Sequence, residues 1–178
     1  VLFNDQNKKL YNRRELKDVS KMTDKDYTPG GMTALLDAVG RTIHKMDMVA
    51  GIHRKDKGNK VLFVIITDGE ENDSKEYTYA DVKKLIKDRQ ENAGWEFIFL
   101  GANIDAAAAA ENLGIDRDRA VKYKNTGSGV RANFKAVAEL SDSLAKSGRV
   151  SDRWKETVEK DEDDAADKQS AAVTSHRR

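Results

Sequence analysis

Hydrophobic residues follow two different patterns along this chain, and the clearest is an unbroken apolar run. Residues 61–66 are all apolar, most of them β-branched, and the run ends abruptly at Thr67-Asp68-Gly69. A strand with one wet face alternates apolar and polar residues, so this run predicts an interior strand of a parallel sheet with both faces covered by helices. Part of a buried helix is the alternative, but the shortness of the run and its Val and Ile content favour a strand.

The second pattern is helical and follows the glycine-rich segment Pro29-Gly30-Gly31. From Thr33 onward, apolar residues recur at intervals of four, four and three, which traces one face of a helix. We expect Thr33 to cap this helix and Asp37 to lie near the positive end of its dipole. The positions of the apolar face are Leu35, Val39, Ile43 and Met46.

Apolar runs and helical spacings of apolar residues continue to residue 147. They predict strands at 95–100 and 120–123 and helices at 78–93, 104–113 and 130–147. The expected caps of these helices are Thr78 with Asp81, Asn103, and Ser128. The expected apolar face of the last helix comprises Val130, Phe134, Val137, Leu140 and Leu144.

The order of these elements predicts the fold class. Residues 1–3 are expected to end a strand, and residues 9–11 to be its hairpin partner. Strands that then alternate with helices predict an α/β fold with a doubly wound sheet and parallel central strands. We expect one domain at 1–148, followed by a charged, mobile tail at 149–178, where apolar residues become sparse. A weak amphipathic helix around Trp154 and Val158 is the alternative within this tail.

The composition mainly excludes certain classes of protein and site. The chain has 178 residues, enough for one domain with a core, and its 32 basic and 31 acidic residues give a net charge of +1. No global field therefore directs the chain to nucleic acid or to a membrane, and no apolar run approaches the roughly 20 residues of a membrane span. The absence of cysteine excludes disulfides and Cys-based zinc sites, and it suits the cytoplasm, where we expect this protein.

The candidate ligand-binding residues lie in three loops, at 30–33, 68–71 and 101–103. We expect them to meet at one edge of the sheet, because open parallel sheets bind ligands beyond the carboxyl ends of their strands. Their hydroxyl, carboxylate and backbone groups suit Mg²⁺, Mn²⁺ or Ca²⁺ rather than zinc or copper. Thr33 and Asp68 are the expected metal ligands. Taken singly, Thr33 is also an ordinary helix cap and Asp68 a common turn residue.

Other reaction classes find no support in the sequence. Neither a Gly-x-x-x-x-Gly-Lys phosphate loop nor a Gly-x-Gly-x-x-Gly fingerprint occurs, and the three histidines stand apart from any Ser or Cys nucleophile pattern. Glu70, Glu71 and Asp73 are expected to form a solvated acidic loop rather than to bind a metal. No catalytic residue is therefore predicted.

Three stretches taken together resemble a von Willebrand factor type A domain of the cytoplasmic, stand-alone bacterial or phage kind. They are residues 29–40, 64–72 and 95–103, within a resemblance that covers residues 1 to 147. It implies a Rossmann-like, doubly wound, mainly parallel sheet with an antiparallel edge hairpin and a metal-ion-dependent adhesion site at its top. Thr33 is similar to the family's metal-binding Thr, and Asp68 to its metal-binding Asp.

The resemblance also implies a function. Such a domain is a non-catalytic protein-interaction module that captures an Asp or Glu of a partner protein through a divalent cation. The cation would be Mg²⁺, with Mn²⁺ or Ca²⁺ as alternatives. Gly31, Glu70 and Asn103 are expected to contact the partner.

One family motif is missing, because no Asp-x-Ser-x-Ser precedes Thr33. In the family it follows a strand in the middle of the sheet. We expect that strand to lie upstream of Val1; the alternatives are a strand supplied by another chain, or poor folding. Without the motif we expect weak or no retention of the cation.

Two other functions remain open. The missing motif would suit a metal-free structural or assembly subunit. A divalent-metal enzyme that processes phosphoesters is also conceivable from a carboxylate at a strand end, but no Lys or Arg stands in the three loops to clamp a phosphate.

Overall fold

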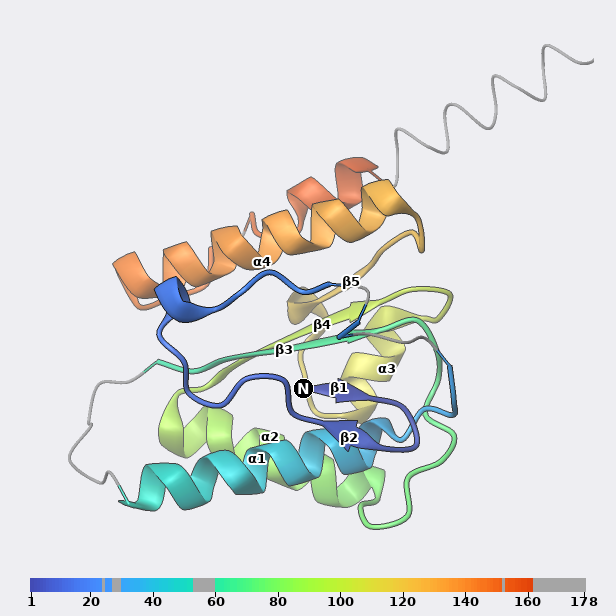
Figure 1. The fold of residues 1–178 in the computed structure, drawn as a ribbon, viewed down its shortest axis with the longest axis vertical. Helices are drawn as coiled ribbons and strands as arrows, with labels where there is room; N and C mark the ends of the chain where they lie inside the picture. Colours follow the sequence, from blue (N-terminus) through green and yellow to red (C-terminus); the bar gives the residue numbers. More distant parts are fainter. Residues whose placement is uncertain (24, 27–29, 53–59, 152, 162–178) are drawn as a thin grey trace, which may run out of the picture. The chain divides into compact units, whose positions relative to one another are not determined.

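The computed structural model describes residues 1–23, 25, 26, 30–52, 60–151 and 153–161. The chain forms two compact units, a first unit of Val1–Lys57 with Glu70–Leu85 and a second unit of Gly58–Gly69 with Ile86–Arg178. The first holds a two-stranded antiparallel sheet and the second a three-stranded parallel sheet, with helices in both (Figure 1). The predicted mixed α/β class is therefore confirmed.

The first unit opens with the hairpin of β1 (Leu2–Phe3) and β2 (Asn7–Lys8). Leu2 lies opposite Lys8 in an antiparallel register. The predicted partner strand at 9–11 was wrong by two residues. The side chain of Asn4 accepts a hydrogen bond from the Gln6 backbone N–H at 2.7 Å, and this tight turn lets pairing begin at once.

The long helix of the first unit is α1 (Leu35–Ile52), preceded by a 3-10 turn at Leu16–Asp18. Its expected apolar face is buried at Leu35, Val39 and Ile43, as the spacing predicted. The first helical hydrogen bond joins the Ala38 N–H to the Ala34 carbonyl at 3.1 Å. Ala34 therefore precedes the first helical residue, and the helix begins at Leu35, two residues after Thr33.

Helix α2 (Tyr79–Ala93) begins in the first unit and ends in the second. Its predicted capping box is confirmed, because the Asp81 carboxylate accepts hydrogen bonds from the Thr78 N–H at 2.9 Å and the Thr78 hydroxyl at 2.6 Å. Val82 and Ile86 are fully buried on its apolar stripe. Gly94 follows the helix in a left-handed conformation, with φ 64°.

The second unit is built on three parallel strands in the order β3 (Leu62–Thr67), β4 (Glu96–Gly101) and β5 (Ala120–Lys122). The run at 61–66 was correctly predicted to form a parallel strand, but its interior position was wrong. In the part of the chain that the structure describes, β3 is an edge strand and Ile66 is 36% exposed. Strand β4 is the interior one, with four fully buried residues, Phe97, Ile98, Phe99 and Leu100.

Helices α4 (Gly127–Ser147) and α3 (Ala106–Asn112) lie on opposite faces of this sheet (Figure 1). Both predicted caps were displaced. Asp105 caps α3 because Asn103 adopts a left-handed conformation, with φ 58°, and turns the chain before the helix starts. Thr126 caps α4 by accepting a hydrogen bond from the Gly129 N–H at 3.2 Å. Ser128 is the second residue of this helix.

The expected apolar face of α4 is only half correct. Leu140 and Leu144 are buried, but Phe134 is 62% exposed and Val130 is exposed as well. A Cβ at Gly129 would lie 2.1 Å from the Lys124 carbonyl oxygen, so the start of the helix packs directly on the backbone. That contact turns small residues inward and the large apolar residues outward; the inward positions are Gly129, Ala132, Asn133 and Ala136.

The core of the second unit continues beyond the boundary expected at 148. Val150, Trp154 and Val158 are buried with β4, β5 and α4, and the Trp154 indole donates a hydrogen bond to the Asp118 carbonyl at 3.0 Å. Residues 156–161 are helical. The remainder of the expected tail, 162–178, lies outside the described residues. None of the described helices is both long and apolar enough to cross a membrane.

Candidate functional site

In the second unit, a polar residue stands on each loop that follows a strand. These residues are Asp68 after β3, Asn103 after β4 and Asn125 after β5. Hydrogen bonds from Ala102 N–H to the Thr67 carbonyl and from Tyr123 N–H to the Gly101 carbonyl, at 2.9 and 3.0 Å, continue the ladder to the ends of the strands. All three loops therefore leave the sheet at its carboxyl edge, where such sheets bind ligands.

Asp68 is held at this edge with its carboxylate exposed. The buried Thr67 hydroxyl donates a hydrogen bond to the Gly69 carbonyl at 3.0 Å and closes the turn around Asp68. Among the described residues, the Asp68 carboxylate accepts one hydrogen bond, a long one of 3.4 Å from the Asn125 amide. Most of its acceptor capacity is therefore open to a ligand.

Asn125 was not among the predicted site residues. Its position directly beyond the third parallel strand was the signal that could have identified it, since the other two candidates follow strands in the same way. Asn103, a predicted partner contact, is exposed at the same edge of the second unit.

Thr33 lies in the first unit, where Asn72 holds its backbone. The Thr33 N–H donates to the Asn72 side-chain oxygen at 2.7 Å, and the Thr33 carbonyl accepts from the Asn72 N–H at 3.0 Å. Its hydroxyl forms no hydrogen bond with any described residue. The predicted role of Thr33 as a helix cap is therefore wrong, and its hydroxyl is available to a ligand.

The start of α1 is capped instead by the loop that follows β3. The Glu71 carboxylate accepts a hydrogen bond from the Leu36 N–H at 2.9 Å, and the Ser74 hydroxyl accepts one from the Asp37 N–H at 3.1 Å. Residues of a loop more than 30 positions away thus satisfy the free N–H groups of the first helical turn. The expected solvated acidic loop is corrected at Glu71 and Asp73, which are both half-buried.

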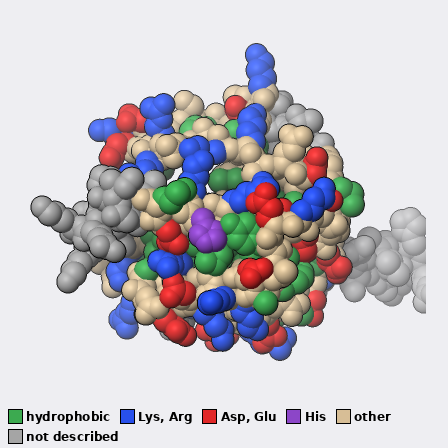
Figure 2. Space-filling model, turned by 90° about the horizontal axis from the view of Figure 1, so that it is seen from below, with side chains coloured by type: hydrophobic (Ala, Val, Ile, Leu, Met, Phe, Trp, Pro, Cys, Tyr) green, Lys and Arg blue, Asp and Glu red, His purple; other side chains and the backbone are tan. Residues whose placement is uncertain are grey.

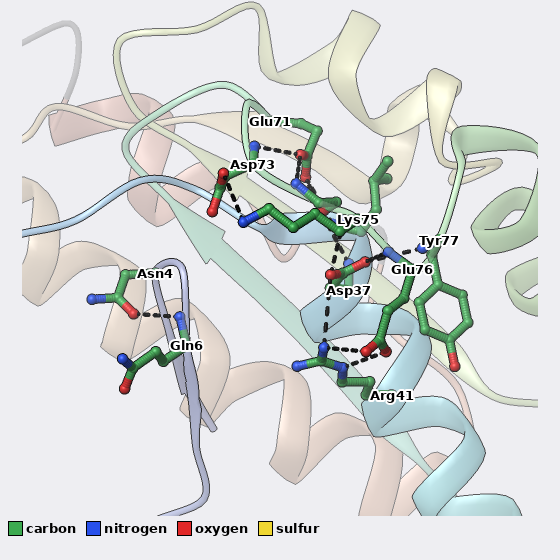
Figure 3. A network of polar contacts seen from close by, with 11 residues as sticks. Asn4, Gln6, Asp37, Arg41, Glu71, Asp73, Lys75, Glu76 and Tyr77 are labelled. Carbon is green, nitrogen blue, oxygen red and sulfur yellow. Dashed lines mark hydrogen bonds and ion pairs between the residues drawn. The ribbon is translucent and has the colours of Figure 1, made fainter.

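Asp37 fastens the far end of the same loop to α1 (Figure 3). Its buried carboxylate accepts hydrogen bonds from the backbone N–H groups of Lys75, Glu76 and Tyr77 at 2.9 to 3.0 Å. Burial raises the pKa of Asp37, but these three bonds and the nearby Arg41 guanidinium outweigh it and bring the pKa below its ordinary value. The side chain is therefore a carboxylate at neutral pH.

The glycine pair before Thr33 packs against the N-terminal hairpin. The Asn4 amide donates a hydrogen bond to the Gly30 carbonyl at 3.0 Å, and the Ala34 N–H donates to the Asn4 carbonyl at 2.9 Å. Gly31 has φ 90°, a conformation that side chains disfavour, and a Cβ there would lie 2.6 Å from the Asp5 carboxylate. Gly31 and Glu70, two predicted partner contacts, are exposed.

The oxygen groups of Thr33 and Asp68 are of the type that hard cations prefer. Within the described residues, no three His, Asp or Glu side chains form a group that could hold a metal. Thr33 and Asp68 each offer an oxygen with little competition from protein donors, and Mg²⁺ commonly takes one or two protein oxygens and completes its octahedron with water. Thr33 belongs to the first unit and Asp68 to the second.

The surface charge is mixed. On the face drawn in Figure 2, acidic and basic side chains are interspersed, with hydrophobic side chains between them. This face therefore carries no large field of one sign.

No protein-family model matches this chain, and no curated protein and no solved structure matches it. The likeness to the von Willebrand factor type A family consequently rests on the three sequence stretches alone.

Proposed function

We propose that this chain is a metal-ion-dependent protein-interaction module of the von Willebrand factor type A kind and has no catalytic activity. Thr33 and Asp68 would hold Mg²⁺, water would fill the remaining positions, and an Asp or Glu of a protein partner would displace one water. The observation that carries the proposal is the exposed Asp68 carboxylate at the carboxyl edge of a parallel sheet, with one long hydrogen bond of 3.4 Å.

Thr33 supports the proposal independently. Its backbone is fixed by two hydrogen bonds, while its hydroxyl has no partner among the described residues. Asn72, which makes both bonds, follows Asp68 by only four residues in the sequence. Convergence of Thr33 and Asp68 on one cation is therefore compatible with the connectivity of the chain.

The fold proposed with this function is the doubly wound, Rossmann-like sheet of that family. Support comes from three parallel strands that alternate with helices, from α3 and α4 on opposite faces of their sheet, and from an antiparallel hairpin elsewhere in the chain. We also propose that the protein is cytoplasmic, because it has no cysteine and resembles the cytoplasmic kind of this domain. We propose that it acts without nucleic acid or membrane, because the net charge is +1.

The proposal is tested with Mn²⁺ as a probe, by following the EPR signal of the free ion during titration with protein. The wild-type chain is expected to reduce the free Mn²⁺ signal, with a weak dissociation constant because few protein oxygens contribute. Thr33→Ala and Asp68→Ala should each abolish this uptake. Asp116→Ala serves as a control, because Asp116 is an exposed carboxylate that makes no side-chain cap.

Uptake that survives both substitutions, or wild-type protein that takes up no Mn²⁺, would contradict the proposal. The second result would favour a metal-free assembly subunit. One observation suits that alternative, since β3 is an apolar edge strand in the described part of the chain and edge strands recruit further strands.

The enzymatic alternative makes a separate prediction. A phosphoester-processing enzyme would hydrolyse p-nitrophenyl phosphate in the presence of Mg²⁺, and Asp68→Asn would remove the activity. We expect no turnover above the rate without protein.

A further inference from the structure

We infer that Glu71 and Asn72 are positioning residues for the cation site, setting the direction of the Thr33 hydroxyl without touching the metal. This inference rests on the proposed function. Neither residue was expected to have such a role, since Glu71 was assigned to a solvated loop. The argument uses only contacts within the first unit.

Thr33 lies between a pair of glycines and the start of a helix. Before it stand Gly30 and Gly31, both at positive φ, and after it begins α1. A cation requires its ligand oxygen at a defined position, about 2.1 Å away for Mg²⁺. A threonine at the end of a glycine pair needs an external restraint to hold its hydroxyl in one place.

Asn4 holds the residues on either side, through the Gly30 carbonyl and the Ala34 N–H, and Asn72 holds Thr33 itself. The Asn72 side-chain oxygen accepts from the Thr33 N–H at 2.7 Å, and its own N–H donates to the Thr33 carbonyl at 3.0 Å. The two bonds hold both backbone polar groups of Thr33, so the residue cannot rotate about its φ or ψ without breaking one of them. The hydroxyl is left out of this pairing and remains open.

Glu71 in turn fixes the loop that carries Asn72. One carboxylate oxygen accepts from the Asp73 N–H at 3.0 Å and the Ser74 N–H at 2.7 Å. The other accepts from the Leu36 N–H at 2.9 Å and the Ser74 hydroxyl at 2.8 Å. One side chain thus folds its own loop and joins that loop to the helix that follows Thr33.

Because of these four hydrogen bonds, Glu71→Gln should disturb the loop although glutamine and glutamate have almost the same size. Each carboxylate oxygen accepts a hydrogen bond from at least one backbone N–H, so the glutamine nitrogen would face a fixed donor wherever it is placed. The side-chain volume is unchanged, and the loss concerns only acceptors. The Asn72 substitutions divide in the same way, because Asn72→Asp keeps an oxygen for the Thr33 N–H and Asn72→Ala does not.

The experiment measures Mn²⁺ affinity by EPR and amide hydrogen exchange in the same full-length variants. Glu71→Gln and Asn72→Ala are expected to weaken Mn²⁺ binding about 10-fold or more, as loss of an outer-shell partner does at other metal sites. Exchange at the Thr33 N–H should accelerate in both variants, and exchange at the Leu36 N–H in Glu71→Gln. Asn72→Asp should bind Mn²⁺ at least as tightly as wild type.

Asp73→Asn is the matched control. It removes a charge from the same loop, but the Asp73 side chain forms an ion pair only with Lys75, at 3.6 Å, among the described residues. Its Mn²⁺ affinity should stay within a factor of about two of wild type, which separates loss of positioning from loss of charge. A purely structural role would lower the melting temperature without changing Mn²⁺ affinity at a temperature where the variants remain folded.

The outcomes distinguish this inference from the proposed function. If wild-type protein binds Mn²⁺ and both Glu71→Gln and Asn72→Ala bind it equally well, the positioning role is wrong and the proposed function stands. If wild-type protein takes up no Mn²⁺, the proposed function fails and the inference fails with it. A parallel loss in the Asp73→Asn control would also overturn the inference, because charge alone would then explain the effect.

Discussion

Gly40 occupies the interior of α1, where glycine ordinarily costs stability. A Cβ at this position would lie 2.5 Å from the Tyr77 ring, closer than real contacts allow. Tyr77 packs there because its N–H is bound by Asp37 and its hydroxyl contacts His44 Nδ1 at 2.7 Å. The glycine therefore provides room for a ring that closes the loop onto the helix.

This contact reverses the usual effect of an alanine. Glycine to alanine in a helix interior normally stabilises by about 1 kcal/mol. We expect Gly40→Ala to destabilise by about 1–3 kcal/mol, because the added methyl displaces the ring. Urea unfolding followed by circular dichroism measures the change.

The same substitution in a Tyr77→Ala protein tests whether the Tyr77 ring causes the destabilisation. In protein that already carries Tyr77→Ala, the same Gly40→Ala substitution should become neutral or stabilising, because the ring is gone. Destabilisation of equal size in both backgrounds would show that Tyr77 is not the reason for the glycine.

Single residues also show where local sequence signals fail. Thr78 with Asp81 forms the expected cap, because both members lie in one turn of chain. Thr33 has the same residue type in a similar position, yet its helix is capped by Glu71 and Ser74. Long-range partners of this kind leave no periodic or short-range trace, so local patterns could not reveal them.

At the scale of elements, two carboxylates attach the loop after β3 to helix α1. Glu71 fastens its start and Asp37 its end, and the Asp37 side chain is only 6% exposed. The pKa of Asp37 is lowered in the folded protein, so the folded state prefers the ionised form. Asp37 thus contributes stability above its unfolded pKa of about 3.9 and loses that contribution as the pH falls through its folded pKa.

This predicts a pH-dependent difference between wild type and Asp37→Asn. At pH 7 the variant should be less stable by roughly 1–3 kcal/mol, because an amide nitrogen would face the donors of the loop. The difference should shrink as the pH falls below about 4, where the wild-type carboxylate takes up its proton. Urea unfolding at several pH values between 7 and 3 gives both quantities.

An exposed carboxylate serves for comparison. Asp142→Asn removes an exposed ion pair with Lys146 on α4 and should change stability little at any of these pH values. A difference for Asp37→Asn that stays constant from pH 7 to pH 3 would contradict the assigned role of its ionisation.

Helix α4 illustrates what an apolar pattern cannot decide. Its end at Gly148, which has φ 70°, was predicted from the sequence, but it begins at Gly127, three residues before the predicted start. Its buried face was half wrong, because Gly129 packs on the Lys124 backbone and places Ala132 and Ala136 against the core. Small residues carry almost no hydrophobic signal, so the exposed Phe134 outweighed them in the pattern.

At the scale of the whole molecule, strand identity was predictable and strand position was not. Unbroken apolar runs correctly indicated the parallel strands β3 and β4. The interior strand is β4 rather than β3, and this depends on which strands are neighbours, a property that no single run encodes. Trp154 and Val158 join the core of the second unit although the residues around them are mostly charged.

Some residues at the candidate site were predictable from the sequence and others were not. Asp68 and Asn103 were predicted because they follow expected strands, and both lie in loops at the carboxyl edge of the second unit's sheet. Asn72 and Glu71 were missed because their partners, Thr33 and Leu36, lie 39 and 35 positions earlier in the chain. The binding of a cation by Thr33 and Asp68 remains the central prediction.

The most direct test is paramagnetic broadening of backbone amide NMR signals by substoichiometric Mn²⁺. A bound Mn²⁺ broadens signals close to it, so we predict that the Thr33 and Asp68 amides lose intensity together at the same low Mn²⁺ concentration. Thr33→Ala should abolish the loss at Asp68 as well. Broadening at Asp68 that persists in Thr33→Ala, or that never reaches Thr33, would contradict a cation shared by these two residues.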